Sequence, residues 1–63
     1  MTFSEKVIYV RGELLLTQAQ LAKELGISQV TVSRWENNNR NPQLIQLSKF
    51  NKYCSKHNII FKE

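Results

Sequence analysis

Residues 29–37 carry side chains suited to reading the edges of DNA base pairs. In a helix with 3.6 residues per turn, Val32 and Trp35 point one way and a mixed polar face is left opposite them. That face brings together an amide, a bare apolar group, a hydroxyl and a guanidinium, which come from Gln29, Val30, Ser33 and Arg34.

Each of these groups has a suitable partner at a base edge. Arginine can bond guanine through two hydrogen bonds, glutamine can do the same to adenine, and an apolar side chain can pack on the thymine methyl group. We therefore predict that Gln29, Val30 and Arg34 contact bases in the major groove and that Ser33 reaches a base or a phosphate. The simpler alternative is the solvated face of an amphipathic helix. An exposed Val30 argues only slightly against it, since isolated surface valines are common.

No other set of residues suggests a reaction or a metal site. The single cysteine, Cys54, excludes an internal disulfide and a cysteine-rich zinc site, and its place in an apolar helical pattern is typical of a buried thiol. The single histidine, His57, is explained by its place near an expected helix end. We therefore expect no enzymatic activity, no metal, no cofactor and no small-molecule ligand.

The composition favours an intracellular domain that binds a polyanion. The 63 residues suffice for one domain, 1–63, with a small core of packed helices. Nine Lys and Arg oppose five acidic residues, and the formal net charge of +4 favours partners such as nucleic acid. Because no secretory signal or bilayer-spanning stretch is recognisable, we expect a cytoplasmic protein with no membrane association.

The elements that must position the candidate residues begin with two capping boxes. Thr2 with Glu5, and Thr17 with Gln20, each have the spacing in which a threonine and an acid or amide satisfy the first N–H groups of a helix. The apolar spacing predicts a first helix up to Leu14 and a second helix up to Leu25, each with an apolar stripe. The pairs expected to pack across the two helix starts are Leu16 with Leu21 and Ile27 with Val32.

The second and third helices are expected to be joined by a short turn. Gly26 can adopt the left-handed conformation that ends a helix, and Ser28 is a natural cap for the next one. Ala22 is small enough for a close helix crossing. The segment 18–37 therefore has the spacing of a helix-turn-helix.

A last helix is predicted after a polar loop. Pro42 is expected in its first turn and His57 near its end. One face is predicted to be apolar and another to be a solvated basic stripe; these are Leu44, Leu47, Phe50 and Cys54, and Lys49, Lys52 and Lys56. For the tail, residues 58–63, three arrangements stay open: packing on the bundle, a short extended segment, or contact with a partner chain.

The sequence resembles a known family through LTQAQLAKELGIS, the following VTVSRWEN, and Pro42 after the loop. It is similar to the Cro/repressor-type helix-turn-helix proteins, also called the XRE family, from about Val7 to Ile59. The resemblance implies an all-α fold, a compact lambda repressor-like bundle of four to five short helices. It also implies sequence-specific binding to double-stranded DNA, commonly as a homodimer on an inverted repeat, and a role in transcription regulation.

The resemblance also implies roles for single residues. Residues matching Gln29, Val30 and Arg34 commonly contact bases, and the residue matching Gln18 holds a phosphate. The free N–H groups at the start of the second helix independently suit Gln18 to that role. Further phosphate candidates are Thr31, Asn37, Asn39 and Arg40, although asparagines also simply suit turns.

The resemblance further implies an ion pair between Arg11 and Glu36. The alternative is two unconnected surface charges of almost no energetic value. A departure from the family is Leu15, where glycine is more common. A leucine with positive φ would be strained, so we expect this connection to adopt a different turn. Asn38 also replaces a common glycine, but asparagine tolerates the left-handed region.

These observations support three hypotheses. The first is a sequence-specific transcriptional regulator, expected to be a repressor that occupies its operator. The second is a protein-interaction module, such as an antitoxin or accessory subunit, with secondary DNA binding. The third is a nonspecific nucleoid or replication accessory protein. Dimerisation is expected through the last helix and tail, by way of Ile45, Tyr53, Ile60 and Phe61.

Overall fold

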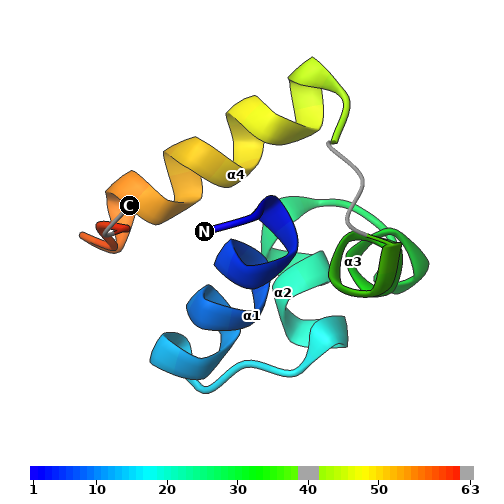
Figure 1. Cartoon of the computed structure of the whole chain (residues 1–63), viewed down its shortest axis with the longest axis horizontal. Helices are drawn as coiled ribbons and strands as arrows, with labels where there is room; N and C mark the ends of the chain where they lie inside the picture. The colour runs from blue at the N-terminus through cyan, green and yellow to red at the C-terminus, as the bar shows by residue number, and fades with distance from the viewer. Residues whose placement is uncertain (39–41, 62–63) are drawn as a thin grey trace.

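Four helices make up the part of the chain that the structure describes, residues 1–38 and 42–61 of a computed structural model. They are α1 (Phe3–Leu14), α2 (Gln18–Leu25), α3 (Gln29–Asn38) and α4 (Leu44–Lys56) (Figure 1). The prediction of an all-α bundle is confirmed. None of these helices is long and apolar enough to cross a membrane.

The starts of α1 and α2 are fixed by the predicted capping boxes. The Thr2 hydroxyl accepts from the Glu5 N–H at 3.2 Å while the Glu5 carboxylate accepts from the Thr2 N–H at 2.8 Å. Thr17 and Gln20 repeat the arrangement at 3.1 and 2.8 Å. Both reciprocal pairs satisfy N–H groups that have no partner inside the helix, so these two starts are encoded locally.

Three helix ends share one geometry, in which a residue at the end of the helix adopts a left-handed backbone conformation. Leu15 (φ 55°), Gly26 (φ 70°) and Asn58 (φ 56°) adopt positive φ. The next residue in each case donates its N–H to the carbonyl five positions back, as Leu16 does to Arg11, Ile27 to Ala22 and Ile59 to Cys54, all at 2.9 Å. This is the Schellman arrangement, and it turns the following apolar residue toward the core.

The expectation of a different turn at Leu15 is wrong. Leu15 itself takes the left-handed conformation that glycine usually supplies, with φ 55° and ψ 47°. Its side chain is 88% exposed, so no packing of that side chain explains the choice. The Schellman hydrogen bond and the burial of the neighbouring Leu16 outweigh the local strain, which is about 1–2 kcal/mol for an ordinary residue.

The core lies where α1, α2 and α4 meet α3. Its largest fully buried side chains are Val7, Val10, Leu21, Val32 and Phe50. Phe3 contacts both Trp35 and Phe50 edge to face, with ring centroids 5.1 Å apart in each pair. This aromatic group packs the start of α1 against α3 and α4, and so it helps to fix the orientation of α3.

Two predictions about α4 are wrong. The helix begins at Leu44 with Gln43 as its cap, so Pro42 lies before the first turn and not inside it. Leu44 is 83% exposed and does not share the buried face. It precedes Phe50 by six residues, which is a rotation of about 120° around the helix. Leu47 and Cys54 lie closer in angle to Phe50, and they are half-buried and buried respectively.

The tail returns to the bundle. Ile59 and Phe61 pack against the core while Ile60 is 81% exposed. The Phe61 ring stacks on Phe50 at 6.4 Å and meets Tyr9 edge to face at 5.9 Å. Of the three arrangements left open by the sequence, packing on the bundle describes residues 59–61.

Candidate nucleic-acid interface

The candidate reading helix, α3, is held at its start by Ser28. The Ser28 hydroxyl accepts from the Thr31 N–H at 3.1 Å and lies 2.9 Å from the Thr31 hydroxyl. Val32 and Trp35 are buried, as predicted from helical geometry. The opposite face of α3 therefore points away from the core.

The structure places the four predicted base-reading residues on this outward face. Gln29, Val30 and Arg34 are exposed and Ser33 is half-buried. The Val30 side chain is 58% exposed and contributes nothing to the core. Ser33 accepts a hydrogen bond from the Asn37 side-chain amide at 3.2 Å, one turn further along the helix. Together they form a surface with donors, acceptors and one apolar group.

Arg11 and Glu36 are brought together across 25 positions of sequence. Arg11 Nε donates to Glu36 Oε2 at 2.5 Å, and Nη2 donates to Oε1 at 2.8 Å. Arg11 Nη1 also donates to the Leu16 carbonyl at 3.2 Å. The Glu36 side chain is only 6% exposed. This two-pronged pair ties α1, and the turn after it, to α3.

Gln18 completes this network. Its side-chain amide donates to Glu36 Oε1 at 3.0 Å from the first position of α2. Burial of the Glu36 carboxylate favours its neutral form, but the hydrogen bonds from Arg11 and Gln18 and the Arg11 charge outweigh that effect and hold the pKa of Glu36 below its ordinary value. The hydrogen bond to Glu36 correspondingly raises the pKa of Arg11. The ionised pair orients Gln18 at the start of α2.

The remaining phosphate candidates are placed unequally. Thr31 is half-buried, with its hydroxyl next to Ser28, and Asn37 is exposed near the end of α3. Asn39 and Arg40 lie outside the residues that the structure describes. The exposed N-terminal end of α2 and the exposed face of α3 therefore supply the described part of the candidate interface.

Sequence reasoning missed Ser4. This serine lies on the inner side of α1, is 5% exposed, and has its hydroxyl 2.6 Å from the Trp35 carbonyl and 2.7 Å from the Glu36 carbonyl. Carbonyls in the last turn of a helix lack partners within it, and the single Ser4 hydroxyl proton is shared between two of them at this end of α3. The available signal was a small polar residue between Phe3 and Val7, on an otherwise apolar stripe.

The His, Cys and acidic side chains of the described residues are scattered or buried. Within residues 1–38 and 42–61, no three His, Cys, Asp or Glu side chains are grouped as metal ligands would be. Cys54 is buried, and burial raises the pKa of its thiol to about 11.

Comparison with known proteins identifies a helix-turn-helix in this chain. A helix-turn-helix family model matches residues 7–57, most of the chain. The HTH-type transcriptional activator BcrR of Enterococcus faecalis is 36% identical over 55 residues, which cover 87% of this chain and 27% of that protein. The chain thus spans about a quarter of the length of this relative. No solved structure gives a significant match.

Proposed function

Because the chain belongs to the Cro/repressor-type helix-turn-helix family, we propose that it is a sequence-specific DNA-binding regulator of transcription that reads the major groove with α3. The observation that carries this proposal is the outward face of α3. It combines exposed Gln29, Val30 and Arg34 with a half-buried Ser33, while the opposite face is anchored by Val32 and Trp35.

The proposed roles divide into base reading and phosphate contact. Arg34 donates two hydrogen bonds to guanine, Gln29 pairs with adenine, and Val30 packs on a thymine methyl. Gln18, Thr31 and Asn37 contact phosphates and set the position of α3, as do Asn39 and Arg40. Phosphate contacts of this kind fix register without reading sequence. The formal net charge of +4 supports the same partner.

Dimerisation on an inverted repeat is part of the proposal, since a single reading helix covers too few base pairs for high specificity. Of the residues expected at the dimer surface, Ile45 and Ile60 are 73% and 81% exposed. Tyr53 and Phe61 are half-buried against their own chain. Ile45, beside exposed Leu44 at the start of α4, is the better candidate for contact between two copies.

The regulatory direction is proposed as repression through occlusion of the promoter. The relative in Enterococcus faecalis is named an activator. A reporter assay must therefore test an operator placed across the promoter and an operator placed upstream of it. We expect an operator placed across the promoter to lower expression. Expression that instead rises when the operator lies upstream would reverse the proposed direction while leaving DNA reading intact. As part of the same proposal, the protein acts in the cytoplasm, on the nucleoid.

The first experiment selects bound sites from a random duplex pool with the purified chain. An inverted repeat with half-sites roughly 34 Å apart is expected for a dimer, and a single short motif would indicate a monomer. Arg34→Gln is expected to lose preference at one position of each half-site, by about 1–3 kcal/mol. Lys23→Gln is the matched control. It removes the same charge as Arg34→Gln, and Lys23 is exposed on α2 outside the proposed interface. An unchanged motif in Arg34→Gln, or no enrichment by the folded chain, would refute the proposal.

A further inference from the structure

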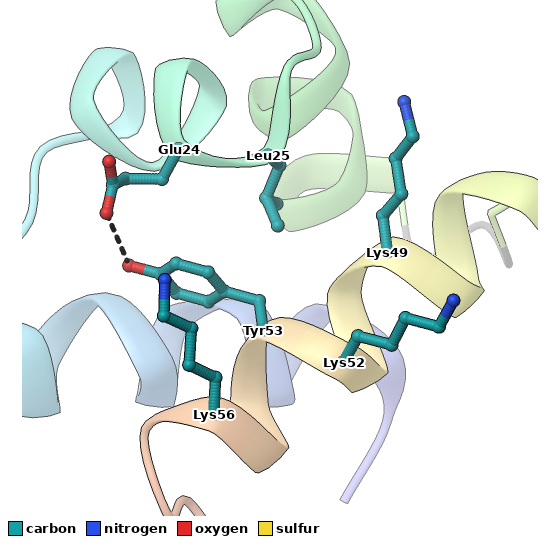
Figure 2. Close-up of a pocket in the computed structure, with 6 residues that line it drawn as sticks. All are labelled: Glu24, Leu25, Lys49, Lys52, Tyr53 and Lys56. Atoms are coloured by element: carbon teal, nitrogen blue, oxygen red, sulfur yellow. Dashed lines mark hydrogen bonds between the residues drawn. The ribbon is translucent and has the colours of Figure 1, made fainter.

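A groove lined by lysines lies between the end of α2 and the middle of α4. It encloses about 350 Å³ and is lined by Glu24, Leu25, Lys49, Lys52, Tyr53 and Lys56. Figure 2 shows the Tyr53 ring below Leu25, with the Tyr53 hydroxyl directed to Glu24 and Lys56 beside the ring. The Tyr53 hydroxyl and the Glu24 carboxylate are 3.4 Å apart.

The lining of this groove carries more positive than negative charge. Lys49, Lys52 and Lys56 follow one another at spacings of three and four residues, where like charges repel and destabilise a helix. Within the described ranges the structure gives no ion pair to any of the three, and all three side chains are exposed. The single acid in the lining, Glu24, accepts from Tyr53. A groove of three cations and one anion therefore favours an anionic occupant.

The floor of the groove is apolar. Leu25 is 6% exposed and Tyr53 is half-buried, and both join α4 to α2. An occupant with carboxylates alone would leave this floor unused. A segment that carries an apolar side chain between acidic ones would bury that side chain on Leu25 and Tyr53 and place carboxylates near the lysines.

None of the residues proposed to contact DNA lines this groove. Its walls come from the last turn of α2 and from α4, whereas the DNA-contacting residues belong to α3, the start of α2 and the loop after α3. The phosphate groups of a DNA backbone would pair with the lysines, but they would place no apolar side chain on Leu25 and Tyr53. The charge and the floor together favour a polypeptide over nucleic acid.

We propose that this groove binds a short acidic segment of a partner protein that carries an apolar side chain between its carboxylates. Lys49, Lys52 and Lys56 pair with the carboxylates, and the apolar side chain packs on Leu25 and Tyr53. The proposal goes beyond DNA reading and does not depend on it, because different residues form the two surfaces.

The test titrates the isotope-labelled chain with a synthetic peptide, acetyl-ELEEFLEE-amide, and follows backbone amide shifts by NMR. Saturable shifts are expected at Leu25, Lys52 and Tyr53 and not at Gln29 or Ser33. Two further peptides separate the contributions: QLQQFLQQ removes the charge and ESEESSEE removes the apolar groups. Both are expected to bind more weakly than the first. Equal binding of either, or no saturable shift with the first peptide, would overturn the proposal.

Substitutions then assign the site. Lys52→Gln is expected to weaken peptide binding by about two- to five-fold, the range for one exposed ion pair. Lys23→Gln removes the same charge outside the groove and is expected to leave the affinity unchanged. Replacing Lys49, Lys52 and Lys56 together by Gln is expected to weaken binding on the order of tenfold or more. Equal effects of Lys52→Gln and Lys23→Gln would show that only net charge matters and would contradict a site.

The same variants distinguish a protein partner from DNA. If the three lysines contacted phosphates, the triple variant would bind a random-sequence duplex with a salt slope smaller by roughly 2.7, and Lys52→Gln would lose more affinity than Lys23→Gln. That result would make the groove part of the DNA interface and overturn the proposal. Equal DNA affinities of Lys52→Gln and Lys23→Gln, together with weaker peptide binding in Lys52→Gln alone, support it.

Discussion

Arg11 donates hydrogen bonds to both carboxylate oxygens of Glu36, and this contact joins α1 to the C-terminal part of α3. The Glu36 side chain is almost fully buried while the Arg11 side chain is 25% exposed. Gln18 bonds the same carboxylate from the start of α2. One acidic side chain thus connects three helices, and two of them supply the proposed DNA contacts.

We expect Arg11→Ala to lower the free energy of unfolding by about 2–3 kcal/mol. This is less than the roughly 3–5 kcal/mol for breaking a fully buried pair, because Arg11 is partly exposed. The loss arises mainly from leaving the Glu36 carboxylate buried without its cation. Urea denaturation followed by circular dichroism measures it, with Lys23→Ala as the exposed control. A loss no greater than that of the control would mean that the pair contributes little.

Acid is expected to remove the stabilisation that Glu36 provides. The pKa of Glu36 in the folded chain is lower than its ordinary value of 4.5, so the unfolded chain binds a proton more readily. The stabilisation is therefore complete above the unfolded pKa and is lost as the pH falls through the folded pKa. Urea denaturation between pH 7 and pH 2 should show a steeper decline for the natural chain than for Glu36→Gln. Glu5 also has a lowered pKa, so Glu36→Gln should retain part of the slope. Parallel declines would contradict the assignment.

Leu15→Gly is expected to stabilise the domain by about 0.5–1 kcal/mol. Glycine removes the left-handed strain at φ 55°, part of which is offset by the greater freedom of glycine in the unfolded chain. Little packing is lost, since the leucine side chain is 88% exposed. Leu15→Ala is the matched control, because it removes the same side chain and keeps the strain. Thermal unfolding should raise the midpoint for Gly and not for Ala; a gain in both would point to the exposed side chain.

Cys54 is expected to resist thiol reagents while the chain is folded. Burial raises the pKa of its thiol to about 11, so the reactive thiolate is scarce at neutral pH. Ellman's reagent should modify the thiol slowly in native buffer and at the rate of free glutathione in guanidinium chloride. Equally fast modification in native buffer would show that the end of α4 opens readily.

The starts of α1, α2 and α3 and the end of α2 could be predicted from sequence because they are encoded locally, whereas α4 begins after Gln43 without a side-chain cap. Thr2 with Glu5, Thr17 with Gln20, and Gly26 with Ser28 act within a few residues, and the structure shows each of them. The left-handed conformation of Leu15 was harder to predict, because the strain of this one residue is outweighed by a hydrogen bond and by burial of Leu16. Intrinsic preference at a single position cannot include those contributions.

Contacts between segments that are distant in the sequence were harder to predict. The proximity of Arg11 and Glu36 came from family resemblance, whereas Gln18 was assigned only to phosphate and is also bonded to Glu36. Ser4 is recognisable as polar on an apolar stripe, but its acceptors lie 31 and 32 positions away. Leu44 was placed on the buried face because spacing alone does not show where the core ends along α4. These features depend on how helices pack, and local sequence does not specify that.

Trp35 is the single tryptophan of the sequence, and its indole is 4% exposed between the rings of Phe3 and Phe50. The molecule therefore carries one tryptophan fluorophore, which can be excited apart from the two tyrosines, at the contact of α1, α3 and α4. Its emission spectrum is expected to reflect a dry, aromatic environment when the helices are packed together and an aqueous environment when they separate. Because Arg34 is its neighbour in the chain, the fluorophore that reports opening of the core sits on the helix proposed to enter DNA, so unfolding and binding can be followed without attaching a dye.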